Sequence, residues 1–287
     1  MPIDSCWNKL PKRALPLVLF TLCACGSDNL PKPQKLGPLR VLGLIASSPE
    51  INDSTPTPIT ITPIISDTTA AGSRTLTFSW KVCPDPGVAF GLEPTCAASA
   101  VLFTNSGTIA ATDPPLTGAP YSGVTTQFGF TLPTNLLASR TATEASNGIP
   151  VLVTYEINGG SETARSFRRI TLTSRSLANL NGNVSLSSIS GLVSGTPNTF
   201  PSSETDLTPV LGSSPDTYTV ISSTGETLTR TENLTISWYT TDGEFEFSRT
   251  DGSRSNKWTP PSSGTPKGLL ILRDDRGGLS LPLTIGY

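Results

Sequence analysis

The stretch Thr75-Leu-Thr-Phe-Ser-Trp80 is echoed later in the chain by Asn233-Leu-Thr-Ile-Ser-Trp238, and both place apolar residues at alternate positions. Alternation predicts strands with one buried face, because successive side chains of a strand point to opposite sides. Each stretch is followed by a second β-type run that ends in a Gly-Gly pair, over 150–160 and 268–278. Glycine readily takes the positive φ that tight hairpin turns need. The echo therefore predicts two copies of one β-sandwich, each with a Trp strand and a closing hairpin.

Further alternating runs and the composition favour an all-β fold. The 287 residues include 25 Gly and 26 Pro, which interrupt helices, and no sustained helical periodicity follows residue 24. The apolar residues expected to share strand faces are Leu76, Phe78, Trp80 and Val82; Phe128, Phe130 and Leu132; Val151, Val153, Tyr155 and Ile157; Leu234, Ile236 and Trp238; and Leu279, Leu281, Leu283, Ile285 and Tyr287.

The positions of these runs predict the domain organisation. We expect β-sandwich domains at 39–178 and 181–287, divided near residue 180. The first is expected to carry a long insertion, roughly 83–145, between its Trp strand and its hairpin. The stretch 194–217 is rich in Ser, Thr and Pro and is expected to be loop.

The N-terminus has the features of an export signal. Lys9, Lys12 and Arg13 precede an apolar run over 14–24. That run is about half of the ~20 residues that a membrane-spanning helix needs. Residues 1–24 are therefore interpreted as a signal peptide.

The run ends in Leu22-Cys23-Ala24-Cys25-Gly26, which resembles the lipobox of bacterial lipoproteins. The resemblance implies cleavage before Cys25 and acylation of that cysteine with fatty acids such as palmitate. Gly26, in place of the Asp that retains lipoproteins at the inner membrane, favours the outer membrane in this resemblance. The alternative is an ordinary secretory signal cut after Ala24 or nearby. Residues 25–38 are interpreted as the lipidated cysteine and a flexible, proline-containing tether.

A second resemblance concerns the later half. Trp238, Gly243, Trp258-Thr-Pro-Pro261 and the run over 270–278 resemble the Ig-like, PKD-like and cadherin-like modules of bacterial surface proteins. The Gly-Asp-Gly signature of PKD repeats and the disulfide of antibody domains are missing, so the resemblance implies an Ig-like sandwich and no particular family. It implies an extracytoplasmic spacer or binding role and supplies no catalytic residues.

Cys83 and Cys96 are the cysteines that remain once the signal peptide is removed and Cys25 is lipidated. They flank a turn-rich segment, and in an oxidising envelope we expect a disulfide between them. A redox pair or a pair of metal ligands is the alternative. The spacing is not Cys-x-x-Cys and the chain has no histidine to complete a zinc site, so the disulfide is favoured.

Three tryptophans are candidates for ligand-stacking residues. Trp80 and Trp238 lie on the apolar faces of their strands, which favours core packing. Trp258 precedes two prolines and is a candidate for an exposed, sugar-stacking position; packing over the sandwich edge is favoured over that.

The sequence gives little support for a metal site or a catalytic site. The absence of histidine excludes Ser-His-Asp and Cys-His catalysis and His-ligated zinc. Calcium, as in cadherin-like modules, would use acidic residues near turns, but alternation of Glu244 and Glu246 with Phe245 and Phe247 fits a plain solvent face. We therefore expect no metal and no cofactor. The acidic residues considered are Asp242, Glu244, Asp251, Asp274 and Asp275.

The chain is expected to be a non-catalytic, membrane-anchored envelope lipoprotein that presents Ig-like modules for spacing, adhesion or partner binding. The partner would be an envelope protein or polysaccharide. A net charge of −2 argues against nucleic acid. The alternative is a carbohydrate-binding lipoprotein or a carboxylate-dependent hydrolase, since paired carboxylates can come from anywhere in a fold.

Overall fold

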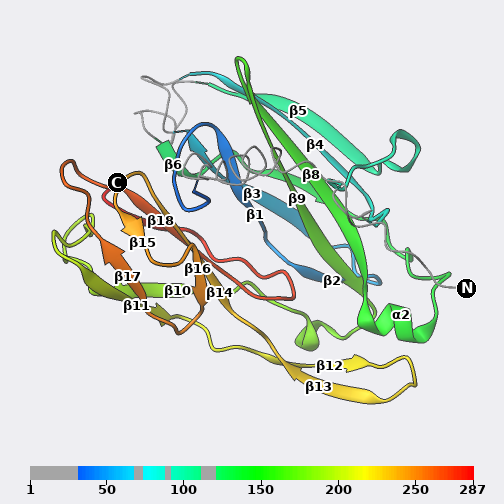
Figure 1. Cartoon of the computed structure of the whole chain (residues 1–287). Coiled ribbons are helices and arrows are strands. Elements are labelled where there is room, and N and C mark those ends of the chain that lie inside the picture. The colour runs from blue at the N-terminus through cyan, green and yellow to red at the C-terminus, as the bar shows by residue number, and fades with distance from the viewer. Residues whose placement is uncertain (1–31, 68–73, 88–91, 111–120) are drawn as a thin grey trace, which may run out of the picture. The chain divides into compact units, whose positions relative to one another are not determined.

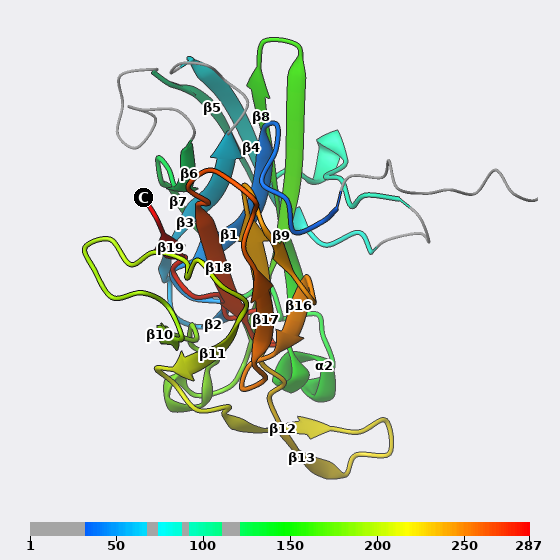
Figure 2. The same cartoon turned by 60° about the vertical axis from the view of Figure 1, so that its left-hand side comes forward.

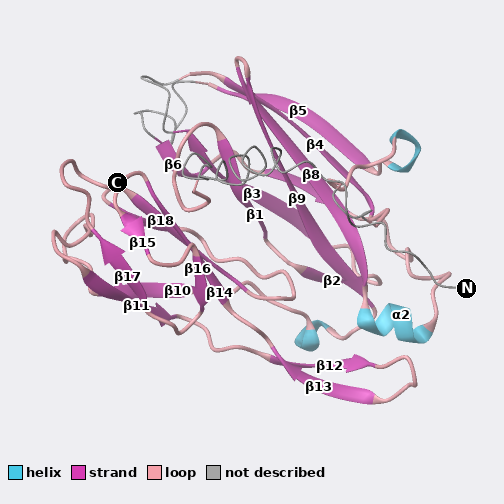
Figure 3. Ribbon diagram, in the orientation of Figure 1, coloured by secondary structure: helices cyan, strands magenta, loops and turns pink. Residues whose placement is uncertain are grey.

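The computed structural model describes residues 32–67, 74–87, 92–110 and 121–287. Residues Gln34–Tyr287 form one compact unit. The regular structure of its described residues is nearly all strand, with one short α-helix, α2 (Ala142–Asn147), and the 3-10 turns Ala98–Ala100 and Leu177–Asn179 (Figure 3). The predicted all-β class is confirmed. Within the described ranges, no helix has the length and apolar character to cross a bilayer.

The first half of the unit contains two sheets (Figure 1). One has the order β1-β3-β6, with β7 also paired to β3, and the other has the order β2-β9-β8-β4-β5. The strands are β1 (Arg40–Ala46), β2 (Glu50–Asn52), β3 (Pro58–Asp67), β4 (Leu76–Pro84), β5 (Phe103–Ile109), β6 (Tyr121–Val124), β7 (Phe128–Thr131), β8 (Ile149–Gly159) and β9 (Glu162–Thr173).

The second half repeats this plan with shorter strands. Its sheets have the orders β10-β11-β17-β15 and β16-β14-β18-β19, and β12 and β13 form a separate two-stranded ribbon. The strands are β10 (Leu186–Ser190), β11 (Thr205–Leu211), β12 (Thr217–Ile221), β13 (Thr227–Thr231), β14 (Thr235–Thr240), β15 (Glu244–Phe245), β16 (Arg249–Asp251), β17 (Asn256–Thr259), β18 (Gly268–Arg273) and β19 (Leu283–Ile285).

The sequence echo has a structural counterpart. The Trp strand of each half pairs with the first strand of its Gly-Gly hairpin, through Trp80↔Tyr155 and Trp238↔Leu270. The hairpins turn at Gly160 and Gly277, where φ is +70° and +100°. A side chain at such φ values is strained, so these turns depend on glycine.

Each half packs its two sheets face to face around its own apolar cluster, which gives the Ig-like sandwich architecture. In the first half Trp80 stacks on Phe128 of the opposite sheet, with ring centroids 4.5 Å apart. In the second half Trp238 packs against Phe245 at 5.2 Å. The two Trp strands lie in different sheets and different clusters. The division into two domains near residue 180 stays a prediction.

Two of the predicted segments contain strands that contribute to the sheets. Strand β11 lies inside 194–217, which was wrongly predicted to be loop throughout. Leu207 and Pro209 are buried on one face of this strand, and its β-branched Thr residues suit the extended backbone. The segment 83–145, predicted to be a long insertion, contributes strands to both sheets of the first half: β5 pairs with β4, and β6 and β7 pair with β3.

The alternation predicted for the last strand is broken at Leu281. Leu279 is 2% exposed and Ile285 is fully buried, whereas Leu281 is 69% exposed. The pairing moves by one residue between the Arg273↔Leu279 bridge and the Leu270↔Leu283 pair. A one-residue slip turns side chains to the other face, which explains the exposed Leu281.

Residues 34–36, which the sequence assigned to the tether, instead lie against β14. Lys35 forms a parallel bridge with Thr240, and the Leu36 amide donates to the Thr240 carbonyl at 2.8 Å. Leu36 is 5% exposed and joins an apolar cluster with Leu42 and Leu269. A single leucine gives no periodicity, so the sequence could not reveal this anchoring contact.

Candidate functional site

A disulfide closes a loop over the outer side of the first half. Cys83, fully buried near the end of β4, is bonded to Cys96, with their Cα atoms 5.8 Å apart. The predicted pairing is therefore present. It fixes both ends of the segment between the two cysteines, of which residues 88–91 lie outside the described part of the chain.

Between this loop and the sheet is a hollow of about 320 Å³. Its floor is the outer face of β4, β8 and β9, because the neighbouring Trp80 and Tyr155 point into the core. Residues 93–96 form the opposite wall. Volumes of this order suit small ligands or a short segment of a polymer. The side chains of the floor are Ser79, Lys81, Thr154, Glu156, Arg165 and Phe167.

Charges of both signs meet in the hollow. Glu156 pairs with Arg165 across β8 and β9, and Arg165 Nε donates to Glu156 Oε2 at 2.7 Å. This hydrogen bond lowers the pKa of Glu156 and raises that of Arg165, on which the Glu93 carboxylate also acts. Both partners are more than a third exposed, so the pair adds little stability but holds two opposite charges at the surface of the hollow.

The pKa of Glu156 is shifted in the direction opposite to that of a glycosidase's general acid. A glycosidase needs one carboxyl group that stays protonated, with a raised pKa, facing a second carboxylate. The pKa of Glu156 is lowered instead, through Arg165. Phe167 is 44% exposed and offers an apolar surface beside these polar side chains.

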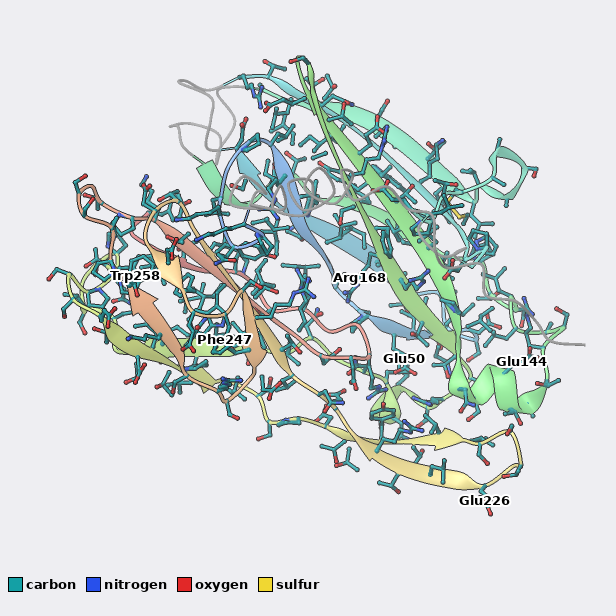
Figure 4. The ribbon with its side chains drawn as sticks, in the orientation of Figure 1. Glu50, Glu144, Arg168, Glu226, Phe247 and Trp258 are labelled. Atoms are coloured by element: carbon teal, nitrogen blue, oxygen red, sulfur yellow. A yellow bond between two sulfur atoms is a disulfide. The ribbon has the colours of Figure 1, made fainter. Side chains whose placement is uncertain are left out.

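The three tryptophans weighed as ligand contacts are core residues. Trp80 is 5% exposed, and Trp238 is fully buried, with Nε1 donating to Thr250 Oγ1 at 2.9 Å. Trp258, labelled in Figure 4, is also fully buried, which agrees with the favoured packing and excludes an exposed sugar-stacking position. It stacks on Phe200 at 4.2 Å, and its Nε1 donates to the Pro201 carbonyl at 3.1 Å.

The acidic residues considered for calcium are not gathered. Asp242, Glu244 and Asp251 are exposed side chains on or beside short strands. Asp275 accepts a hydrogen bond from Asn233, whereas Asp274 binds backbone amides within its own turn. In the described part of the chain no three His, Cys, Asp or Glu side chains are placed to hold a metal ion. Cys25, the predicted lipidation residue, lies outside the described residues.

A buried ion cluster joins the two halves, and sequence reasoning missed it. Glu50 of β2 is 3% exposed and accepts from Arg175 at 3.2 Å and from Arg276 at 2.5 Å. Arg276 also pairs with Glu232 at 3.2 Å, and the Asn181 amide donates to Glu50 at 2.8 Å. The partners of Glu50 are more than 120 residues away in sequence, so no local pattern could connect them.

Comparison with known proteins leaves the function open. Neither a protein-family model nor a curated protein sequence matches the chain. Red sea bream transglutaminase aligns at 12% identity over 86% of this chain, with a TM-score of 0.25, and this chain covers 31% of that one. An adhesin from Mobiluncus mulieris aligns at 10% identity over 85% of this chain and 99% of its own, with a TM-score of 0.32. The collagen adhesin of S. aureus aligns at 12% identity over 88% of this chain and 94% of its own, with a TM-score of 0.24. Similarities at this level do not assign a function.

Proposed function

We propose that this chain is a lipid-anchored, non-catalytic binding protein of a bacterial envelope, and that it holds its partner in the hollow beneath the Cys83–Cys96 loop. The observation that carries the proposal is the hollow itself. A disulfide holds the loop over the outer face of β4, β8 and β9, and the space between is lined by charged, hydroxyl and aromatic side chains.

The N-terminal sequence supports the membrane location. The lipobox ending at Cys25 would supply the acyl chains, and two or more such chains hold a protein stably on a membrane. The segment from Cys25 to Pro33, ahead of the compact unit at Gln34, is too short for a domain of its own. Fully extended at about 3.3 Å per residue, it would reach roughly 30 Å. The binding site would thus stay close to the membrane surface, with the outer membrane favoured by Gly26.

Chemistry within the hollow supports a partner with both polar and apolar groups. Lys81 and Arg165 offer cationic donors, and Glu93 and Glu156 offer acceptors. Such a set fits a segment of an envelope protein that carries both charges, because complementary charges select the correct partner and orientation.

An envelope polysaccharide is the second candidate. The specific observation in its favour is Phe167, a large exposed aromatic side chain beside hydroxyl groups and charges in the same hollow. Sugar rings present apolar faces and polar edges, and a platform of this kind serves both.

A site-specific crosslinking experiment tests the proposal. The photoreactive residue benzoylphenylalanine replaces Phe167 in the full-length chain, in intact cells of the native host. In a matched variant it replaces Phe247, a half-buried phenylalanine of the second half that lies under Arg254 and outside the hollow. A protein crosslinked only from position 167 supports the main proposal, and polysaccharide crosslinked only from that position supports the second candidate. Equal crosslinking from both positions, or none from 167, contradicts both.

Hydrolysis is tested with the same chain. Purified protein is incubated with the crosslinked partner or polysaccharide, and new chain ends are counted. Binding without turnover is expected. Turnover that Glu156→Gln abolishes would overturn the non-catalytic assignment.

A further inference from the structure

Arg168 occupies an unusual position on β9. The strand places Ala164, Ile170 and Leu172 on its inner face, where they are at most 9% exposed. Arg168 falls on this same face by alternation, and it pairs with Val153, which is fully buried. A charged group at an inward position is costly unless something compensates it. The residue as a whole is half-buried, but its Nε and Nη2 atoms are fully buried.

A second arginine reaches the same region from the other half. Leu269 and Ile271 of β18 pack in the cluster that joins the two halves, and Arg273 follows them on that face of the strand. Arg273 Nη2 donates to the Leu42 carbonyl of the first half at 2.6 Å. Its Nε atom is also fully buried.

The positive charge of Arg273 acts on the guanidinium group of Arg168. Burial lowers the pKa of Arg168 to about 10; the carboxylate of Asp274 opposes this shift, and the positive charge of Arg273 adds to it. Arg168 nevertheless stays protonated at neutral pH, since that pKa is well above 7. Two like charges are therefore held together in the partly dehydrated junction between the halves.

The N–H groups of these arginines are not all satisfied. Arg168 Nε and Nη2 and Arg273 Nε have no acceptor among the described residues. The carboxylate that acts on Arg168, that of Asp274, has other partners. Its Oδ1 accepts from the backbone amides of Arg276 and Gly278, and its Oδ2 accepts from Asn181 at 3.2 Å. Buried donors of this kind are normally paired with protein, water or an ion.

The neighbouring ion cluster does not supply the missing charge. Glu50 and Glu232 are bound by Arg175 and Arg276. The charges that act on Arg168 are those of Asp274 and Arg273. Two arginines therefore face one carboxylate at this place, which leaves an excess positive charge. A water molecule would satisfy donors but would leave that charge uncompensated.

We infer that a small monovalent anion, of the chloride class, binds between Arg168 and Arg273 and is coordinated by their buried N–H groups. The excess positive charge and the unpaired N–H groups of the two arginines both favour an anion as the ligand. The turn at Gly277 approaches Arg168 closely, since a Cβ atom added to this glycine would lie 3.5 Å from Arg168 Nη2, and this close approach favours a small anion over a large one. The anion would bridge β9 of the first half and β18 of the second, and so stabilise their junction.

Bromide provides the direct test on the unchanged chain. Crystals of the mature protein are grown with bromide in place of chloride, and anomalous scattering is measured at the bromine edge. An anomalous peak within hydrogen-bond distance of Arg168 Nε and Arg273 Nε is expected. An ordered water at that place, or a direct Arg168–Asp274 pair, overturns the inference.

A solution experiment adds a matched control. Thermal unfolding is followed at constant ionic strength while gluconate, a large organic anion, is replaced stepwise by chloride. The Tm of the wild-type chain is expected to rise with chloride, because a ligand that binds only the folded state stabilises it. Arg168→Leu should remove this chloride dependence, whereas Arg230→Leu, on the exposed strand β13, should keep it. Equal chloride dependence in all three chains contradicts the inference.

Discussion

Glu50 and Arg276, 226 positions apart in sequence, form a buried ion pair 2.5 Å long between the two halves of the folded unit. The side chain of Glu50 is 2% exposed and that of Arg276 is 11% exposed, so the pair is shielded from water. Figure 4 labels Glu50 on β2, the edge strand that pairs with β9. The ribbon β12–β13 extends this junction, because Asn147 of α2 binds the Ile221 carbonyl at 2.7 Å, and two views show the ribbon beside that helix (Figures 1 and 2).

The first prediction concerns this ion pair. Glu50→Gln removes the charge that compensates Arg175 and Arg276 while it keeps the shape of the side chain. Breaking a buried pair from one side costs about 3–5 kcal/mol, because the remaining charge is left unpaired. We expect a loss of this size in the free energy of unfolding, measured by urea denaturation. Because Glu50 links the two halves, both halves should unfold in one transition, followed by the fluorescence of their tryptophans.

Glu226→Gln is the matched control, because Glu226 is exposed in the turn between β12 and β13 (Figure 4). It should change stability by less than about 0.5 kcal/mol. Two well-separated transitions in the wild-type chain would contradict tight coupling of the halves.

The second prediction concerns pH. Burial raises the pKa of Glu232 above its ordinary value. A raised pKa means that the folded state binds this proton more tightly than the unfolded state, so the contribution to stability grows as pH falls towards the ordinary value of about 4.3. Relative to Glu232→Gln, the wild-type chain should therefore gain stability as the pH is lowered from 7 towards about 4.3. The free energy of unfolding of both chains across this range is the measurement, and a parallel pH dependence would be the contrary result.

The third prediction tests the register shift in the last strand. Leu279→Ala should destabilise by about 2–5 kcal/mol, as expected for a buried leucine. Leu281→Ala should stay within about 0.5 kcal/mol, because that side chain is 69% exposed. If both variants lost the same free energy of unfolding, Leu281 would be buried like Leu279, and the unbroken alternation predicted from the sequence would hold.

The sequence predicted those parts of the fold that depend on local pattern. Alternation around Trp80 and Trp238 marked the strands, and the glycines at 160 and 277 marked the turns, because both signals act within a few residues. Strand β11 was missed because its buried residues, Leu207 and Pro209, give a weak alternation in a stretch rich in Ser, Thr and Pro.

The candidate site was less accessible from the sequence. The cysteine pair was predictable from its spacing and redox compartment. The hollow was not, because its floor combines the outward-facing residues of three strands, whose register is set by long-range pairing. Arg168 did leave a signal, since a charge interrupts the inner-face positions between Ala164 and Ile170. Arg273 lies 105 positions further on in the sequence. The sequence therefore could not predict that the two arginines come together in the folded chain.

The fourth prediction concerns the disulfide. Cys83 and Cys96 are 13 positions apart in the sequence. Replacing both by alanine removes the disulfide that closes this loop, which should lower the free energy of unfolding by about 3 kcal/mol in the chain-entropy model. It should also release the wall of the hollow and weaken crosslinking from position 167. Urea denaturation with and without reductant measures the stability. Reductant should destabilise the wild-type chain and leave the double variant unchanged; an effect of similar size on both would rule out this explanation.

The last prediction concerns Cys25. If this residue is acylated, Cys25→Ser removes every lipid chain at once, and the protein should move from the membrane fraction to the soluble fraction of the envelope. Each buried methylene contributes about 0.8 kcal/mol to membrane binding, so partial retention by weaker contacts is not expected. Mass spectrometry of the wild-type N-terminal peptide should show acylated Cys25. An ordinary secretory signal, cut after Ala24 or nearby, leads to the opposite result: an unmodified N-terminal peptide, and the same soluble fraction for the wild-type chain and the serine variant.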